Sequence, residues 1–367
     1  MSMTDQATDE RFMRLALDLG RRGLGATWPN PAVGAVVVKD GIIIGRGWTA
    51  PGGRPHAEPQ ALKRAGKAAE GATLYVTLEP CSHEGKSPPC VNSITRAGIA
   101  RVVSAMEDPN PEVAGQGHQR LKDKKVVVEV GLLAQEARRA HAGHILKMTK
   151  GRPHVLLKLA VSADGKAGLA GRRPAQISSE AARKRVFQLR AQSDAILVGI
   201  GTVLADNPAL SCRLPGMEGR SPVRVILDGQ LKAPIASHVI ATVRETPTWV
   251  FGAHSASQIA GEILEERGAK VFRVGTTKGR LNLDEVLQIL ASEGITRLLV
   301  EGGPTIAASF VEAGSVDEVA LIRSQKALGN EAIDALEGQP LEALTQGFTL
   351  TGSEQVESDR IERYERA

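Results

Sequence analysis

The chain is poor in aromatic residues and in cysteine. Only 3% of its 367 residues are Phe, Trp or Tyr, and it has three cysteines. Three cysteines cannot form the disulfide framework of a small secreted protein, so any chemical role for them would be metal binding or catalysis. The scarcity of aromatic side chains disfavours a surface on which nucleic-acid bases stack.

Long apolar runs are also absent. The run 195–204 is one of the longest, and it is far shorter than the roughly 20 residues that span a bilayer. The amino terminus carries Asp5, Asp9 and Glu10 and lacks the basic-then-apolar order of a secretory signal. We therefore expect a cytoplasmic protein that has no membrane partner.

The length suits two domains of ordinary size. The net charge is +5, and it is unevenly placed: residues 1–150 hold 21 Lys and Arg against 15 Asp and Glu (+6), and the remainder holds 25 against 26 (−1). A basic first half suits an anionic substrate, a phosphate ester or a nucleic acid, but a solvated surface explains the charge equally well.

Short apolar runs alternate with amphipathic stretches throughout the chain, which is typical of an α/β fold. In the first part, strands are predicted at 33–38, 42–44, 73–78, 101–106 and 126–130, and helices at 10–22, 59–69, 91–97 and 134–147. In the second part, strands are predicted at 155–161, 195–199, 223–227, 248–251, 271–274, 297–300 and 316–322, and helices at 181–191, 258–267, 283–291 and 305–313.

The best candidate boundary is Gly151-Arg152-Pro153, where turn-forming residues separate two complete sets of elements. We therefore predict one domain over 1–150 and a second over 151–367. Strand then helix repeats so often in the second part that a largely parallel sheet is expected there.

Three residues have the chemistry of zinc ligands. His56 lies in His56-Ala57-Glu58, and Cys81 and Cys90 each follow a proline. Zinc accepts imidazole and thiolate together, and three protein ligands leave the fourth position for the water that hydrolysis requires. The sequence therefore predicts a catalytic zinc site at His56, Cys81 and Cys90.

Glu58 is the predicted proton carrier of this site. Residues two apart in mid-helix point about 200° away from each other, so His56 and Glu58 can converge only at a helix end. Pro59 supports this placement because proline is tolerated in the first turn. Cys90 opens a predicted helix and Cys81 follows a predicted strand; a helix N-terminus favours the thiolate form.

The order His-x-Glu, Pro-Cys and a second Cys is the signature of zinc-dependent nucleobase deaminases, with one departure. The usual Cys-x-x-Cys is extended here to eight intervening residues, 82–89. In this chemistry activated water attacks the ring carbon that bears the amino group, and Glu58 moves the proton to the ring nitrogen and the departing ammonia.

The long cysteine loop and several other motifs resemble the bacterial bifunctional riboflavin-biosynthesis deaminase–reductase family. The motifs of the first part are Pro29-Asn30-Pro31-Ala32-Val33-Gly34, Thr77-Leu78-Glu79-Pro80-Cys81-Ser82-His83, Pro88-Pro89-Cys90 and Asp108-Pro109-Asn110-Pro111. Those of the second part are Lys158-Leu159-Ala160-Val161-Ser162-Ala163-Asp164-Gly165, Leu189-Arg190-Ala191-Gln192, Thr202-Val203-Leu204-Ala205-Asp206-Asn207-Pro208 and Glu301-Gly302-Gly303-Pro304.

The resemblance implies a cytidine-deaminase-like domain followed by a dihydrofolate-reductase-like domain. It implies zinc-dependent removal of the 2-amino group from a diamino-hydroxy-pyrimidine that carries a phosphoribosylamino group. The second domain would then use NADPH to reduce the ribosyl chain to ribityl. The small phosphorylated aminopyrimidine would be the partner, with no nucleic acid, and a homo-oligomer is expected.

The resemblance also assigns residues. Substrate contacts would come from Asn30, His83, Lys86, Asp108, Asn110, Arg190, Leu210, Arg213 and Glu301. Cofactor contacts would come from Lys158, Ser162, Asp164, Thr202, Asp206, Gly302, Gly303, Pro304 and Thr305. On physical grounds alone, the Gly302–Thr305 turn between a strand and a helix suits a cofactor phosphate, but an ordinary turn can have the same residues.

Two positions depart from the family pattern. Gln176-Ile177-Ser178 stands where Trp-Ile-Thr is usual, and Thr49 stands where a histidine is common. The first puts a nicotinamide-side contact in doubt and the second a pyrimidine contact.

Two alternative functions remain: a nucleic-acid editing deaminase, and a deaminase whose second domain is not catalytic.

Overall fold

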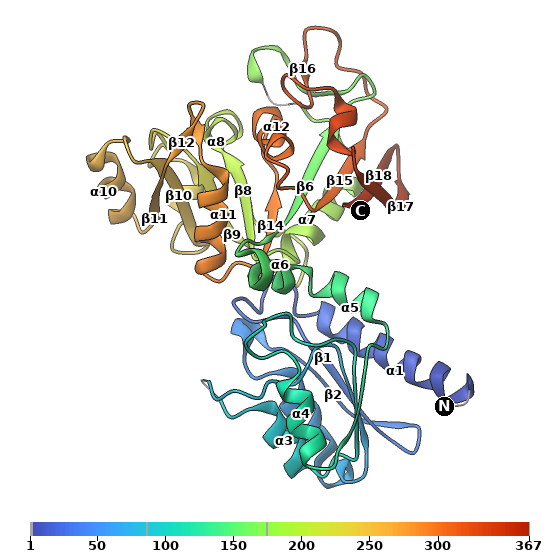
Figure 1. The fold of residues 1–367 in the computed structure, drawn as a ribbon. Coiled ribbons are helices and arrows are strands. Elements are labelled where there is room, and N and C mark those ends of the chain that lie inside the picture. Colours follow the sequence, from blue (N-terminus) through green and yellow to red (C-terminus); the bar gives the residue numbers. More distant parts are fainter. Residues whose placement is uncertain (1–2, 86, 174, 367) are drawn as a thin grey trace. The chain divides into compact units, whose positions relative to one another are not determined.

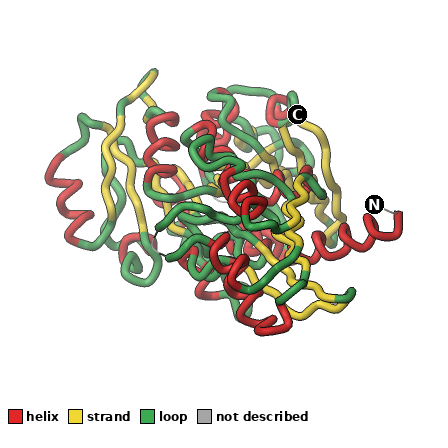
Figure 2. The backbone as a smooth tube through the Cα atoms, turned by 60° about the horizontal axis from the view of Figure 1, so that its bottom comes forward, coloured by secondary structure: helices red, strands yellow, loops and turns green. Residues whose placement is uncertain are grey.

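The computed structural model describes residues 3–85, 87–173 and 175–366. The chain divides into two compact units, residues 1–152 and 153–367 (Figure 1). Helices and strands alternate along most of both units (Figure 2), so the α/β class predicted from the sequence is confirmed. No helix in the described part of the chain is long and apolar enough to cross a membrane.

The first unit has five strands and six α-helices within the described residues. The strands are β1 (Gly34–Lys39), β2 (Ile42–Trp48), β3 (Thr73–Val76), β4 (Arg101–Ser104) and β5 (Val127–Val130). The helices are α1 (Met3–Arg21), α2 (Ala57–Ala65), α3 (Cys90–Arg96), α4 (Gln116–Asp123), α5 (Ala134–Ala140) and α6 (Ala142–Lys150).

These strands form one sheet in the order β2-β1-β3-β4-β5, in which β3, β4 and β5 are parallel and β1 is antiparallel to both neighbours. Helices cover both faces. A Cβ on Gly34 would lie 1.9 Å from the Ala16 carbonyl oxygen in α1, and one on Gly47 would lie 2.2 Å from the Ala57 carbonyl oxygen in α2. Gly34 and Gly47 point to opposite faces, so α1 and α2 pack on opposite sides of the sheet.

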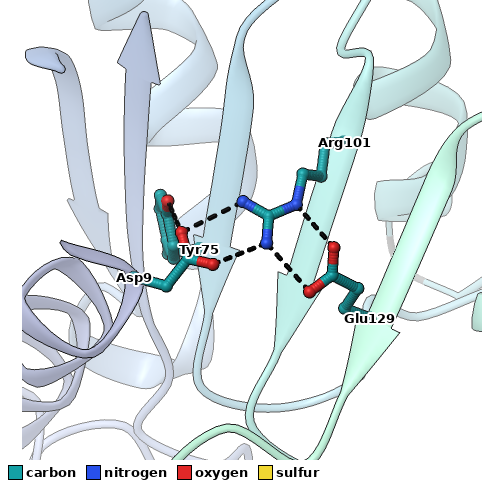
Figure 3. A network of polar contacts seen from close by, with 4 residues as sticks. All are labelled: Asp9, Tyr75, Arg101 and Glu129. Carbon is teal, nitrogen blue, oxygen red and sulfur yellow. Dashed lines mark hydrogen bonds and ion pairs between the residues drawn. The ribbon is translucent and has the colours of Figure 1, made fainter. Parts of the chain in front are cut away.

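A polar network ties α1 to the sheet (Figure 3). The Arg101 guanidinium in β4 donates to both carboxylate oxygens of Asp9 in α1, at 3.0 and 2.6 Å, and to Glu129 in β5, at 2.8 Å for each bond. The Tyr75 hydroxyl of β3 donates to the same Asp9 carboxylate. Burial alone would raise the pKa of Asp9, but Arg101 and Tyr75 outweigh it and hold that pKa below its ordinary value.

The second unit is built on a nine-stranded sheet. In spatial order its strands are β11 (Lys270–Val274), β10 (Thr248–Ala253), β9 (Val223–Leu227), β8 (Ala195–Gly199), β14 (Arg297–Val300), β6 (His154–Val161), β15 (Glu318–Arg323), β18 (Asp359–Arg366) and β17 (Phe348–Val356). Its α-helices are α7 (Glu180–Ala191), α8 (Ile200–Asp206), α9 (His238–Ala241), α10 (Gln258–Glu266), α11 (Leu283–Ser292) and α12 (Pro304–Glu312).

The seven strands from β11 to β15 are parallel, which confirms the prediction of a largely parallel sheet. Most of their side chains are apolar and buried, as strands covered on both faces require, although β9 also buries Arg224. The antiparallel hairpin β17–β18 at one edge was not predicted. Most of β17 is exposed and carries polar residues, so it lacks the apolar alternation from which a strand is recognised.

Short pairs of strands complete the second unit. They are β7 (Lys166–Gly168) with β16 (Ile333–Asp334), and β12 (Thr276–Thr277) with β13 (Arg280–Leu281). Each is too short to give a periodic pattern in the sequence. Both pairs line cavities that are described below.

Arg101→Met should lower the free energy of unfolding by about 2–3 kcal/mol, because it leaves the nearly buried Asp9 carboxylate without its cation. The difference from the parent should shrink as the pH falls through the depressed pKa of Asp9, since protonated Asp9 no longer forms the ion pair. Urea unfolding followed by tryptophan fluorescence measures both effects. Arg138→Met, at an exposed position, is the control; an equal loss in both variants would contradict a special role for Arg101.

Candidate active sites

Three side chains of the first unit meet at one point. The ligand atoms of His56, Cys81 and Cys90 all lie within 4.8 Å of one another. His56 Nδ1 is 3.3 Å from Cys90 Sγ and 3.7 Å from Cys81 Sγ. The Cys90 backbone N–H also donates to Cys81 Sγ at 3.3 Å. No other group of three His, Cys, Asp or Glu in the described residues comes together in this way.

Two helix starts and a strand end bring these ligands together. His56 is the N-cap residue of α2, and Glu58 lies in its first turn. Cys90 is the first residue of α3, while Cys81 follows the end of β3 by five residues. The predicted helix start at Pro59 is therefore two residues late, but the placement of His56 and Glu58 at a helix end is as the sequence indicated.

The geometry of this group fits zinc. With Zn–S near 2.3 Å and Zn–N near 2.0–2.1 Å, a tetrahedral site separates a nitrogen ligand from a sulfur ligand by about 3.6 Å. The observed separations of 3.3 and 3.7 Å bracket that value. Hydrogen bonds from the Cys90 thiol and from His56 lower the pKa of Cys81 to about 4, which favours the thiolate that zinc binds.

Glu58 lies beside the sulfur ligands. Its side chain is almost fully buried, with 3% of the residue exposed, and it shares a hydrogen bond with Cys90. Burial and the neighbouring Cys81 thiolate raise the pKa of Glu58 to about 7. A carboxyl group poised near neutrality can both accept and release a proton.

Glu79 holds the loop that carries Cys81. Its buried carboxylate accepts four backbone N–H bonds, from Asp108 at 3.0 Å, Gly115 at 2.9 Å, Gly117 at 2.7 Å and His118 at 3.2 Å. Asp108 and Gly115 precede α4, and Gly117 and His118 lie in its first turn. The sequence does not indicate this role of Glu79, because no local pattern shows which backbone groups a carboxylate will meet.

Asn30 contacts the ligand segment directly. Its amide donates to the Gly53 carbonyl at 2.8 Å and lies 3.5 Å from His56 Nε2. Thr49 is buried, and its hydroxyl accepts the Val33 N–H at 3.0 Å. The Thr49 hydroxyl is therefore engaged with the neighbouring backbone rather than free for a pyrimidine.

Asp108 and Asn110 lie in the loop that Glu79 secures. Asp108 Oδ1 accepts the Asn110 N–H at 2.9 Å and lies 3.3 Å from Nε2 of His144 in α6. Burial alone would raise the pKa of Asp108, but His144 and the backbone bond hold it below its ordinary value. Asp108 is thus an ionised carboxylate attached to the last helix of the unit.

The insert between the two cysteines is largely exposed. His83 lies on its surface, and Lys86 lies outside the described residues. The Arg54 guanidinium donates to the Ser87 hydroxyl of the insert. Arg54 was not singled out from the sequence, where it is one arginine among many.

In the second unit, three adjoining cavities lie where parallel strands end. A cavity of about 250 Å³ is lined by Lys158, Gln176, Ile177, Ser178 and Glu301, among others. It shares Thr202, Asp206, Gly303 and Pro304 with a central cavity of about 320 Å³. A third cavity of about 590 Å³ shares Leu227, Thr305 and Ile306 with the central one. The carboxyl ends of parallel strands are the usual place for a ligand in such sheets.

A buried ion pair lies beside the first of these cavities. The Arg190 guanidinium binds both carboxylate oxygens of Glu301, at 2.8 and 3.0 Å. Burial alone would raise the pKa of Glu301, but Arg190 and Lys158 hold it below its ordinary value. Burial lowers the pKa of Lys158 against the opposing charge of Glu301.

The remaining predicted residues of this unit fall in three groups. Gly302 to Thr305, Thr202 and Asp206 line the cavities. Ser162 and Asp164 instead hold a loop, because the Asp164 carboxylate accepts the Ser162 hydroxyl at 2.5 Å and the Gly329 N–H at 2.7 Å. Leu210 is buried and Arg213 is exposed.

The Gly302–Thr305 turn fits a dinucleotide phosphate. Gly303 is the N-cap residue of α12 and carries no capping side chain, so backbone donors of the helix start face the cavity. A Cβ on Gly303 would have no neighbour closer than 3.9 Å, so the turn is open there. Arg172 and Arg173 also line the central cavity, and Arg172 forms an ion pair with Glu337 at 2.5 Å.

Comparison with known proteins places the chain in a family. Residues 6–106 match the cytidine and deoxycytidylate deaminase zinc-binding region, and residues 153–361 match the RibD C-terminal domain. Riboflavin biosynthesis protein RibD of Bacillus amyloliquefaciens is 47% identical over 311 residues, which cover 85% of this chain and 83% of the relative. The protein of the same name from Escherichia coli K12 is 40% identical over 335 residues, or 88% of this chain and 89% of the relative.

Solved structures agree. Acinetobacter baumannii RibD superposes with a TM-score of 0.88 at 34% identity, over 99% of this chain and all of the other. A diaminohydroxyphosphoribosylaminopyrimidine deaminase/5-amino-6-(5-phosphoribosylamino)uracil reductase from Thermotoga maritima gives 0.85 at 35% identity, over 99% and 100%.

The chain therefore belongs to the RibD family of bifunctional deaminase/reductases of riboflavin biosynthesis. It joins a cytidine-deaminase-like domain to a RibD reductase domain, and its cofactors are zinc and NADPH. This confirms the resemblance read from the motifs and favours it over a nucleic-acid editing deaminase and over a non-catalytic second domain.

The purified protein should hold about one zinc per chain, and Cys81→Ser and Cys90→Ser should each lose most of it, because serine is a poor ligand for zinc. Metal analysis after gel filtration measures the zinc content. Cys212→Ser is the matched control, since this buried thiol lies in the other unit. Full zinc occupancy in both ligand variants would contradict the assignment.

Proposed function

We propose that the first unit removes the 2-amino group of a diamino-hydroxy-pyrimidine that carries a phosphoribosylamino group. The second unit then reduces the ribosyl C1′ of the product and leaves a ribityl chain. The observation that carries this proposal is the meeting of His56, Cys81 and Cys90 beside the buried Glu58. The name of the Thermotoga relative, which is similar over nearly the whole chain, supports the choice of substrate.

In deamination, we assign the metal-ligand role to His56, Cys81 and Cys90 and the proton transfers to Glu58. Zinc, when bound, supplies the Lewis acidity that activates water near neutral pH. Glu58 accepts the proton that this water loses and passes it to the ring nitrogen and then to the departing ammonia. The pyrimidine amine is thereby exchanged for a carbonyl oxygen, with water consumed and ammonia released.

Around that reaction, the proposed substrate contacts of the first unit are Asn30, His83, Lys86, Asp108 and Asn110. Asn30 also holds the segment before His56, so it helps to orient the His56 imidazole as well. Asp108 offers its second carboxylate oxygen as an acceptor, because His144 and Asn110 occupy the first.

In reduction, NADPH supplies the hydride when bound. We assign its contacts to Thr202, Asp206 and the turn from Gly302 to Thr305, which line the adjoining cavities. Lys158 also lines the first cavity. Ser162 and Asp164 remain proposed as cofactor contacts, and their side chains also hold a loop of the unit.

The proposed substrate contacts of the second unit are Arg190, Leu210, Arg213 and Glu301. The two hydrogen bonds between Arg190 and Glu301 fix the orientation of both side chains. Hydride transfer depends on the relative placement of the cofactor and the substrate. A buried ion pair can help to position them, and neither a strong acid nor a metal is needed.

We propose that the deaminase domain comprises residues 1–150 and the reductase domain residues 151–367, close to the division between the compact units. We also propose a homo-oligomer that acts on a small molecule and not on nucleic acid. A cytoplasmic location is supported by the three free thiols, two of which belong to the proposed zinc site.

Glu58→Gln should keep its zinc and its fold but lose at least 10²–10⁴-fold in deamination, in keeping with the general size of acid–base catalysis, because an amide cannot carry the proton. Ammonia release from the aminopyrimidine measures the activity, and metal analysis checks the zinc. Glu70→Gln, at an exposed position in the same unit, is the control. Activity within a few-fold of the parent would mean that another group moves the proton.

Asp206→Ala should slow reduction by roughly 10- to 100-fold and leave deamination unchanged, because it disturbs the placement of the two reactants in one unit only. The assay supplies the deaminated intermediate and follows NADPH absorbance, with ammonia release measured separately. Glu265→Ala, exposed on α10, is the control. Equal reduction in Asp206→Ala and the parent would remove this residue from the site.

A further inference from the structure

Arg54 is a cation on the segment that leads to His56, and the proposed deamination does not yet use it. It lies two residues before His56 and is half-buried. In the described parts of the chain no Asp or Glu forms an ion pair with its guanidinium. Its positive charge is therefore not neutralised by a neighbouring carboxylate.

The backbone of Arg54 is held firmly. The Ala50 N–H donates to the Pro55 carbonyl at 3.0 Å, and the Asn30 amide donates to the Gly53 carbonyl at 2.8 Å. A Cβ on Gly53 would lie 2.7 Å from Asn30 Nδ2, so this segment and Asn30 are in close contact. Arg54 thus projects from a segment whose position is set by the same residues that set His56.

The guanidinium lies against the insert between Cys81 and Cys90. It donates to the Ser87 hydroxyl, and a Cβ on Gly85 would lie 3.4 Å from its Nη2 atom. Ser87 and Gly85 belong to the insert that ends at the ligand Cys90. Arg54 therefore connects the segment before His56 with the segment before Cys90.

A guanidinium has five N–H donors in a rigid plane, and the bond to Ser87 uses only one of them. The others match the oxygens of a phosphate, which arginine commonly binds through two parallel bonds. A substrate whose pyrimidine lies at the metal and Glu58 carries its phosphate a ribose away from the ring, and we infer that this phosphate lies at the segments that Arg54 connects. A phosphate there would meet a preoriented and unneutralised cation.

We propose that Arg54 binds the phosphate of the phosphoribosylamino-pyrimidine and makes the deaminase selective for phosphorylated over dephosphorylated substrate. This proposal rests on the proposed function. It adds a specificity-determining residue to the deaminase site, beyond the metal ligands, Glu58 and the pyrimidine contacts.

The test compares kcat/KM for the phosphorylated aminopyrimidine and for the same compound after phosphatase treatment. Arg54→Ala should lower kcat/KM for the phosphorylated form by about 10- to 100-fold, mainly through KM, because charge-assisted hydrogen bonds are worth roughly 1.5–3 kcal/mol. The dephosphorylated form should react as it does in the parent. Arg54→Lys, which keeps the charge but not the planar fork, should lose less of the preference.

Lys63→Ala is the matched control, because it removes the same charge from an exposed position on α2 and should leave the preference unchanged. Ribose 5-phosphate should inhibit the parent and not Arg54→Ala at equal concentration. Zinc content is measured in every variant. If Arg54→Ala loses zinc, the comparison of Arg54→Lys with the parent decides.

An equal loss with both substrates would overturn the proposal and make Arg54 a brace between the two segments. Unchanged kcat/KM for the phosphorylated form would overturn it as well, since the phosphate would then be bound elsewhere. A parent enzyme that deaminates neither form would instead refute the proposed function, and the role of Arg54 with it.

Discussion

The deaminase unit depends on the convergence of ligands that are far apart in the chain. His56 and Cys90 are separated by 34 residues, yet their ligand atoms come within 3.3 Å. Such a meeting requires that the starts of α2 and α3 lie at the same edge of the sheet, beside the loop that follows β3. Gly47 allows α2 to approach β2 closely enough, since any larger side chain would strike the helix backbone.

Buried carboxylates stabilise both units, and each is neutralised in a different way. Glu79 has four backbone N–H donors and thereby joins the Cys81 loop to the segment before α4. Glu301 is paired with the guanidinium of Arg190 through two hydrogen bonds. A buried carboxylate without such partners would be costly, so each one restricts the arrangement of the chain around it. Arg101 adds a third restriction by holding α1 through Asp9.

Charge is distributed unequally around the proposed deaminase site. Glu58 is buried next to Cys81 and Cys90, whereas Arg54 lies two residues before His56 and has no carboxylate partner among the described residues. In the reductase unit Arg172 and Arg173 line the central cavity beside the start of α12, and there Arg172 is paired with Glu337.

The sequence by itself determined the α/β class, most of the long elements and the group of side chains proposed to bind zinc. These features can be recognised in the sequence because they are local. They are the apolar periodicity of the elements and the types and order of His56, Glu58, Cys81 and Cys90. Only the tertiary structure decided what Glu79, Asp164, Thr49 and Arg54 contact, because a side chain's partners come from distant segments. The same reason explains the missed β17–β18 hairpin, whose exposed polar strand is held by hydrogen bonds to a neighbour and not by an apolar pattern of its own.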